Sequence, residues 1–307
     1  MNREEIKEHL NIMRRQEGAT YCCSDYLQGE RTRPNSDGKI DALCRLKMTQ
    51  WSYQVIDYIK FRRETVSIAM NYLDRFLSSG CARAKKVMTC RKEYQLASMT
   101  CLFIAIKINE PVMIDMTLLT DLSKGIYTPS DFSRMETDIL FGLNWLVNGP
   151  TAQTFAIHFL TLIQDHISNT SYDYQRLLEL VSYQIELAVG EYKIMTEKPS
   201  VVAAASIWNN IEDTCPNETF LRQFHEAALL SMSIQLEDII EVKEHLHELK
   251  VGASMQMRPS SLVLIQHSPR STSLTPSEGK SQDIPCRKEH KQHSPICVSR
   301  RKLQIKR

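Results

Sequence analysis

The stretch VSIAMNYLDRFLSSG, residues 66–80, has the spacing of a helix that buries one face. Its apolar residues recur every three or four positions, which places them along one side of a helix; they are Val66, Ala69, Met70, Leu73, Phe76 and Leu77. Asp74 lies at the edge of this stripe, and Arg75 projects from the opposite side, so the two cannot pair with each other. A carboxylate beside a core-facing stripe therefore needs a partner on another helix.

The same helical periodicity extends over most of the chain, and no segment alternates like a strand. It predicts five helices in residues 41–148, at 40–59, 63–79, 93–108, 115–122 and 130–142. It predicts five more in residues 149–250, at 151–167, 173–193, 199–211, 217–229 and 231–249. The sequence thus predicts an all-α protein of two tandem five-helix units.

Each unit contains one helix rich in small residues, at 96–109 and at 200–211. Small side chains let neighbouring helices approach closely, so these two are expected to be the central helices. Residues 1–40 are expected to hold a short charged helix, at 4–15, followed by a loop at 18–39 that contains three Gly and one Pro.

Charge is unevenly distributed along the 307 residues. The chain has 38 Lys and Arg against 36 Asp and Glu, and residues 251–307 hold 11 of the bases but only 3 of the acids. The body therefore has six more acids than bases, which does not favour a nucleic-acid-binding core. Residues 251–307 are also rich in Ser, Thr and Pro, so we expect a disordered basic tail.

The nine cysteines are irregularly spaced and follow a polar start, MNREEIKEHL, so we expect reduced thiols in an intracellular protein. The longest apolar run, residues 102–106, is too short to cross a bilayer. The tail offers Cys and His at 286, 290, 293 and 297, but their spacing is not a common zinc pattern. No phosphate loop or catalytic motif is visible. We therefore expect no metal, no cofactor and no enzyme activity.

Asp74 is one of four charges on or beside core-facing stripes of four helices, the others being Arg45, Lys107 and Glu136. Each one alone is explained by a long side chain that reaches water from the edge of the core. Buried charges are costly unless paired, and helix order suggests Arg45 with Asp74 and Lys107 with Glu136. Because Lys107 ends its helix, the second pair would lie at the surface, where it could bind the helix end of a partner.

Four segments resemble, in the right order, the motifs of the N-terminal cyclin box: RLKMTQW (45–51), AMNYLDRFL (69–77), LFIAIKINE (102–110) and RMETDILFGLNW (134–145). The resemblance covers residues 41–147, is weaker over 150–250 as a second box, and is absent from the tail. AMNYLDRFLS and the short N-terminal segment are most similar to D-type cyclins, although their Leu-x-Cys-x-Glu motif is missing.

The resemblance implies a regulatory subunit that forms a heterodimer with a cyclin-dependent kinase and activates it in cell-cycle control, with G1/S timing as in D-type cyclins. It implies an internal salt bridge between Arg45 and Asp74, and kinase contacts by Lys107 and Glu136. Apolar neighbours such as Phe103 or Ile114 would complete the interface. The alternative is a transcription-type cyclin or a two-box basal transcription factor; the latter usually has a zinc ribbon and basic boxes.

The cyclin resemblance also implies a substrate-docking groove for Arg-x-Leu peptides, matched here by Met48, Trp51, Gln54 and Gln95. Gln54 replaces the usual acid, and Lys47 falls where an apolar residue is typical and would repel an incoming Arg. We therefore expect a weakened or retuned groove; the alternative is that Trp51 is only a core anchor. The basic segment 80–93 is either a solvated loop or an added contact.

Three residues of the tail precede proline and are candidate phosphorylation sites: Ser268, Thr275 and Ser294. The basic end SRRKLQIKR, residues 299–307, is either a nuclear import signal or a generic basic terminus. We expect the protein in the nucleus and cytoplasm, with no membrane and no nucleic acid among its partners.

Overall fold

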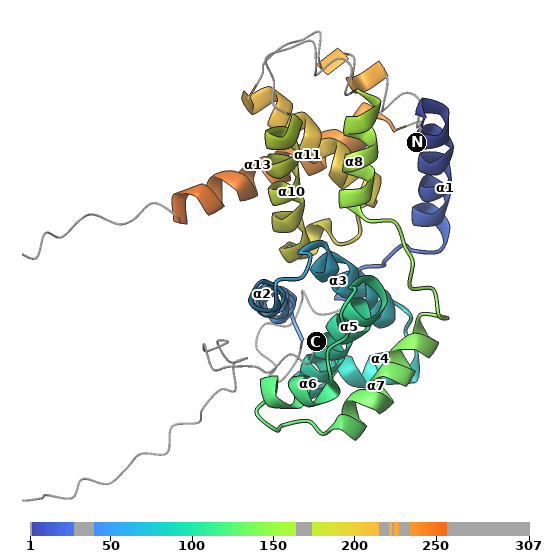
Figure 1. The fold of residues 1–307 in the computed structure, drawn as a ribbon, viewed down its shortest axis with the longest axis vertical. Coiled ribbons are helices and arrows are strands. Elements are labelled where there is room, and N and C mark those ends of the chain that lie inside the picture. Colours follow the sequence, from blue (N-terminus) through green and yellow to red (C-terminus); the bar gives the residue numbers. More distant parts are fainter. Residues whose placement is uncertain are drawn as a thin grey trace, which may run out of the picture.

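The computed structural model describes residues 2–27, 40–163, 174–214, 221–222, 224–226 and 234–256. These ranges are helical and contain no strand, as predicted. Figure 1 shows two helical bundles stacked along the long axis of the molecule. The candidate phosphorylation sites, the basic end and most of the helix expected at 217–229 lie outside the described residues.

The first bundle contains α2 (Ala42–Ile59), α3 (Glu64–Ser78), α4 (Ala82–Met88), α5 (Arg91–Asn109), α6 (Met116–Leu122) and α7 (Pro129–Gly142). Its central element is α5, which packs against α2, α3, α4 and α7. Every residue from Leu96 to Ile106 is buried, which confirms the expectation that this helix is surrounded by neighbours.

Helix α4 was not expected, because segment 80–93 was interpreted as a loop from its basic composition. The structure instead forms a short helix here, and Cys81 caps its first turn with a sulfur that accepts from the Ala84 backbone N–H. Ala84 and Val87 lie three residues apart and are both fully buried in the core. The two apolar residues anchor α4, and the cations between them remain on its outer side.

The second bundle contains α8 (Ala152–Leu162), α10 (Tyr174–Gly190), the short 3₁₀ helix η1 (Tyr192–Ile194), α11 (Pro199–Thr214) and α13 (Leu236–Gln256). Helix α11 packs against α8, α10 and α13, so it is the central helix of this bundle, as predicted. Helix α13 continues to Gln256, whereas the tail was expected to begin at residue 251.

The N-terminal helix α1 (Arg3–Ala19) packs on the second bundle, beside α8 (Figure 1). Ile6, Leu10 and Met13 recur at helical spacing and join the hydrophobic core of that bundle. Asn2 and Glu5 form a capping box that fixes the start of the helix. Helix α1 is therefore anchored in the core of the second bundle, whose other residues lie far from α1 in the sequence.

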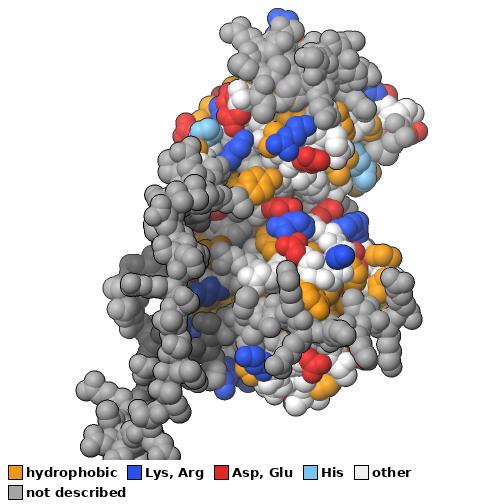
Figure 2. Space-filling model, turned by 60° about the vertical axis from the view of Figure 1, so that its left-hand side comes forward, with side chains coloured by type: hydrophobic (Ala, Val, Ile, Leu, Met, Phe, Trp, Pro, Cys, Tyr) orange, Lys and Arg blue, Asp and Glu red, His pale blue; other side chains and the backbone are white. Residues whose placement is uncertain are grey.

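Polar contacts join the two bundles. Arg63 Nε lies 2.8 Å from Glu186 Oε2 of α10, and the same guanidinium pairs with Asp57 of α2. Thr151, at the start of α8, donates to Glu64 Oε1 of α3 at 2.5 Å. Figure 2 shows side chains of both charges gathered at the level where the bundles meet.

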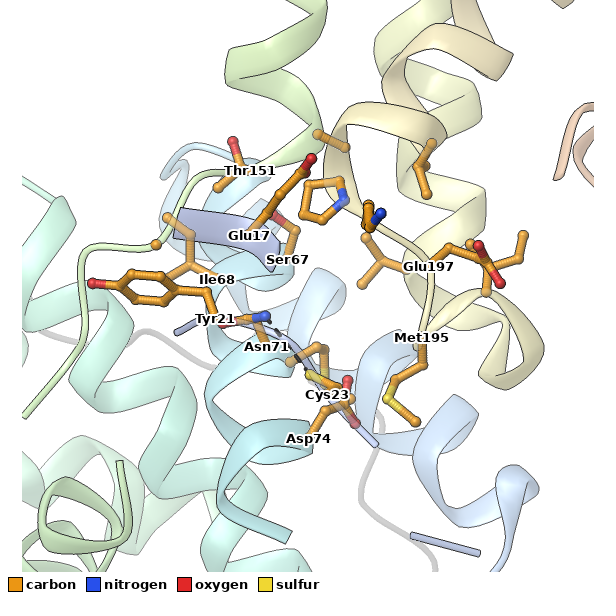
Figure 3. A pocket seen from close by; sticks show the side chains of 18 of the residues that line it. Glu17, Tyr21, Cys23, Ser67, Ile68, Asn71, Asp74, Thr151, Met195 and Glu197 are labelled. Atoms are coloured by element: carbon orange, nitrogen blue, oxygen red, sulfur yellow. Dashed lines mark hydrogen bonds between the residues drawn. The ribbon is translucent and has the colours of Figure 1, made fainter. Parts of the chain in front are cut away.

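A cavity of about 140 Å³ lies at this junction (Figure 3), lined among others by Tyr21, Cys23, Asn71 and Met195. Pockets for drug-sized ligands start at about 300 Å³, so this cavity is smaller than such a pocket.

Candidate functional site

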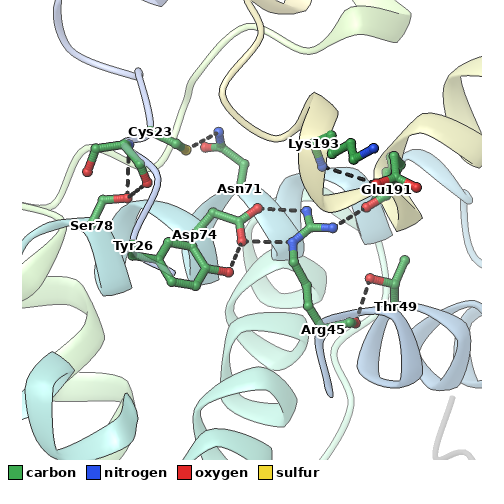
Figure 4. A network of polar contacts seen from close by, with 11 residues as sticks. Cys23, Tyr26, Arg45, Thr49, Asn71, Asp74, Ser78, Glu191 and Lys193 are labelled. Atoms are coloured by element: carbon green, nitrogen blue, oxygen red, sulfur yellow. Dashed lines mark hydrogen bonds and ion pairs between the residues drawn. The ribbon is translucent and has the colours of Figure 1, made fainter. Parts of the chain in front are cut away.

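Arg45 of α2 and Asp74 of α3 form a buried, bidentate ion pair (Figure 4). Arg45 Nε donates to Asp74 Oδ1 at 3.0 Å and Nη2 donates to Oδ2 at 2.8 Å, a geometry that only a guanidinium provides. Burial alone would lower the pKa of Arg45, but the Asp74 carboxylate outweighs burial and raises it. The structure thus places these two residues together, as helix order suggests.

Two further contacts complete this pair. Tyr26, in the segment after α1, donates its hydroxyl to Asp74 Oδ1 at 2.9 Å. Burial and the adjacent carboxylate raise the pKa of Tyr26 well above its usual range, so it remains a hydrogen-bond donor at neutral pH. Arg45 Nη1 donates to the Val189 carbonyl at 2.7 Å, at the C-terminal end of α10 where a cation is favourable.

Lys107 and Glu136 form the second pair, at the surface of the first bundle. Lys107 Nζ, in the last turn of α5, lies 3.0 Å from Glu136 Oε1 of α7. The Lys107 side chain is 44% exposed and that of Glu136 is 13% exposed. An incoming protein group can therefore reach the ammonium directly and the carboxylate at its edge.

Phe103 and Ile114 were expected to supply apolar surface beside this pair, and that prediction is wrong. Their exposed fractions are 5% and 7%, because both belong to the core of the first bundle. Exposed apolar side chains follow each charged residue along the chain: Ile108, Val112 and Met113 come after Lys107, and Phe141, Trp145 and Leu146 come after Glu136.

Trp145 combines exposure with an unusual backbone. Its φ angle is 61°, which is unfavourable for a bulky L-residue, and 60% of its surface is exposed. Its ring makes an edge contact with Phe141, with ring centroids 5.9 Å apart. Backbone strain at a large exposed aromatic does not stabilise the core, so the exposed surface that Trp145 shares with Phe141 is a candidate interface.

Two of the four residues of the expected docking groove are buried, one is half-buried and one is exposed. Met48 and Trp51 belong to the core and are 3% and 4% exposed, whereas Gln54 is on the outside of α2. Gln95 is half-buried, and its Oε1 lies 2.9 Å from the Tyr127 hydroxyl. This burial favours the alternative that Trp51 is a core anchor.

Sequence reasoning missed the role of Arg75. It does point away from Asp74, but it is buried and donates to the Leu146 carbonyl at 2.8 Å. Its guanidinium also lies over the Tyr21 ring, 4.6 Å from the centroid. Arg75 thus holds the segment after α7 and the segment after α1 against α3, and no local pattern signals contacts of such long range.

The described residues hold no group of three or more His, Cys, Asp or Glu side chains arranged to bind a metal ion. The six cysteines in the described ranges are free thiols. None of the helices within those ranges combines the length and apolar character needed to cross a bilayer.

Residues 8–148 match the family model "Cyclin, N-terminal domain", and residues 150–270 match "Cyclin, C-terminal domain". The chain belongs to the cyclin family, which confirms the resemblance found in the four motifs. The N-terminal match begins within α1, whereas the motifs placed the first box at residue 41.

Named relatives and one solved structure agree with this assignment. Cyclin-A1-4 of Oryza sativa subsp. japonica is 30% identical over 185 residues, which cover 58% of this chain and 49% of the relative. Cyclin-A1-2 of Arabidopsis thaliana is 26% identical over 283 residues, 84% of this chain and 58% of the relative. The chain therefore spans about half the length of the curated relatives it matches.

A viral cyclin from herpesvirus saimiri has the same fold, with a TM-score of 0.58 and 19% identity over 78% of this chain and 97% of that chain. Cyclin-B2-1 of Oryza sativa subsp. japonica is 28% identical over 67% of this chain and 44% of its own length. These named plant relatives are A- and B-type, so the D-type subtype stays a prediction.

Proposed function

We propose that this cyclin binds a cyclin-dependent serine/threonine protein kinase and activates it in cell-cycle control, without contributing a catalytic residue. The observation that carries the proposal is the ion pair of Lys107 and Glu136 at the surface of the first bundle. Membership of the cyclin family supports it.

The pair suits the end of a partner helix. Helix ends leave backbone N–H and C=O groups without partners, and Lys107 supplies donors while Glu136 supplies acceptors 3.0 Å away. The exposed rings of Phe141 and Trp145 follow Glu136 on the same helix and the turn after it. Aromatic side chains of this kind are frequent anchors at the centre of protein interfaces.

Activation then follows from selective binding. A protein kinase needs an ion pair between a lysine of its sheet and a glutamate of its C-helix. A partner that binds only the active position of that helix shifts the kinase toward it. A shift from 1:99 to 99:1 requires about 5.5 kcal/mol of differential binding.

A buried ion pair stabilises the bundle that carries this surface. Arg45 joins α2, α3 and the end of α10 through Asp74 and Val189. A rigid surface loses little conformational entropy when it binds, so more of the contact energy is available to move the kinase helix.

Timing and location are part of the proposal. The D-type resemblance of residues 69–78 supports a role at G1/S, and the basic residues 299–307 support residence in the nucleus as well as the cytoplasm. Abundance through a synchronised culture and imaging of a fluorescent fusion test these two points.

The purified chain is mixed with a panel of cyclin-dependent kinases, and binding and histone phosphorylation are measured. Lys107→Glu is expected to weaken kinase binding at least tenfold while the variant stays folded, as checked by circular dichroism. The matched control is Lys243→Glu, since Lys243 pairs with Glu212 at 2.8 Å on the second bundle. Absence of wild-type binding to every kinase, or equal losses in both variants, would overturn the proposal.

A further inference from the structure

A cationic face surrounds the start of α5. It consists of Lys47 of α2, Lys85 and Lys86 of α4, and Arg91 and Lys92 of α5, and all five residues are exposed. Residues 80–92 contain five Lys and Arg but no acid. The fifth of these cations, Arg83, points inward and pairs with Glu93 and Asp138.

Two acids, Asp41 and Glu93, link cations of the three helices. Burial raises the pKa of Asp41, but hydrogen bonds from Cys44 and the charges of Arg91 and Lys47 outweigh burial and lower it. The Asp41 carboxylate therefore lies near Lys47 of α2 and Arg91 of α5. Lys86 Nζ of α4 lies 3.6 Å from Glu93 Oε1 in the first turn of α5.

The stability of the fold does not explain this arrangement. Clustered like charges repel one another, and Arg91 and Lys92 occupy the first turn of α5, where the positive end of the helix disfavours cations. Glu93, the acid of that turn, is already 2.8 Å from Arg83. An ordinary solvated surface mixes both signs of charge in similar number, whereas the five cations of this face outnumber the two acids named beside them, Asp41 and Glu93.

We propose that the cationic face docks an acidic segment of a protein substrate. Leu43 is 53% exposed and lies one turn before Lys47 on α2, so an apolar contact adjoins the charges. This combination fits a peptide that carries both carboxylates and an apolar side chain. Residues 1–250 hold six more acids than bases, which disfavours a nucleic acid as the occupant.

The proposed docking explains a difference between this chain and the family pattern of the Arg-x-Leu groove. Lys47 replaces an apolar residue and repels the arginine of an Arg-x-Leu peptide, while it attracts a carboxylate. The docked protein is a kinase substrate only if the proposed function holds, so binding is measured on the full chain without any kinase.

The probe is a fluorescein-labelled peptide of about twelve residues, rich in Glu with two Leu, followed by anisotropy at about 50 and about 300 mM salt. The wild type is expected to bind and to lose affinity at the higher salt. Lys47→Glu with Lys92→Glu is expected to raise the Kd at least tenfold. Lys193→Glu with Lys198→Glu makes the same charge change on the second bundle and is expected to retain binding.

Three results would overturn the inference: no binding of the acidic peptide, equal losses in both double variants, or tighter binding of an oligodeoxynucleotide of the same charge. If the peptide binds as expected but no kinase binds to the chain, the docking proposal is supported and the proposed function is contradicted. The two failures are therefore distinguishable.

Discussion

The Arg45 guanidinium faces the Asp74 carboxylate in a bidentate pair that is almost completely shielded from water, with 4% and 3% of the two side chains exposed. The remaining nitrogen of the guanidinium binds the Val189 carbonyl. A single arginine thereby joins three helices from both bundles. The surface proposed above to bind the kinase lies on α5 and α7 of the first bundle, and this pair fixes α3, which packs against α5.

Asp74→Ala is expected to destabilise the protein by about 3–5 kcal/mol, because it leaves the Arg45 charge buried without its partner. Urea denaturation followed by circular dichroism measures the change. The control is Glu179→Ala, which removes an exposed pair with Arg176 and is expected to cost less than about 0.5 kcal/mol. A loss below about 1 kcal/mol for Asp74→Ala would contradict the role assigned to the pair.

Glu17 ties α1 to the start of α11. Its side chain is fully buried and accepts from the Ser200 backbone N–H at 2.9 Å, the Ser200 hydroxyl at 2.5 Å and Arg14 at 3.0 Å. Glu17→Ala is expected to cost about 2–3 kcal/mol, because these buried donors lose their acceptor. Glu8→Ala, on the exposed side of α1, serves as the control in the same denaturation assay. Equal stability of the two variants would contradict this role.

Trp145→Gly separates binding from stability. Glycine adopts a positive φ without strain, so the free energy of unfolding is expected to change by less than about 1 kcal/mol. Kinase binding, measured by calorimetry, is expected to weaken at least tenfold because the exposed ring is lost. Wild-type affinity in the variant would show that Trp145 is outside the interface.

His158 of α8 makes an edge contact with His9 of α1, with ring centroids 4.9 Å apart. Burial and the neighbouring His9 lower the pKa of His158 below its ordinary value. The unfolded chain therefore binds the proton more readily, and the contribution to stability is present above about pH 6.5 and lost as pH falls through the folded pKa.

Melting temperatures between about pH 7.5 and 5.5 test this sign. The wild type is expected to lose stability over this range, and His158→Gln is expected to lose less. The same pH dependence in both proteins would contradict the assignment.

Periodicity was sufficient to predict the long helices, because each buries a regular stripe in one of the two cores. The partners of Asp74 and Lys107 were also predictable, since two acids and two bases beside such stripes leave few pairings. The basic composition of residues 80–93 concealed α4, because Ala84 and Val87 are only two apolar anchors in a cationic stretch.

Contacts between distant segments could not be predicted. Nothing near Tyr26 or Val189 in the sequence indicates that both meet the Arg45–Asp74 pair. Phe103 was placed on the partner surface because it precedes Lys107 by one turn, yet α5 is surrounded on enough sides to bury it. The packing of α1 on the second bundle is likewise a tertiary property, since the spacing of its apolar residues does not say which core they join.

The most direct test of the central claim exchanges the two charges, in the double variant Lys107→Glu with Glu136→Lys. The exchange restores an ion pair between α5 and α7, so the fold and its melting temperature are expected to match the wild type. Affinity for the kinase is expected to remain at least tenfold weaker, because each charge meets its partner with the wrong sign. Wild-type affinity in the exchanged variant would show that the pair is only structural and would contradict the account.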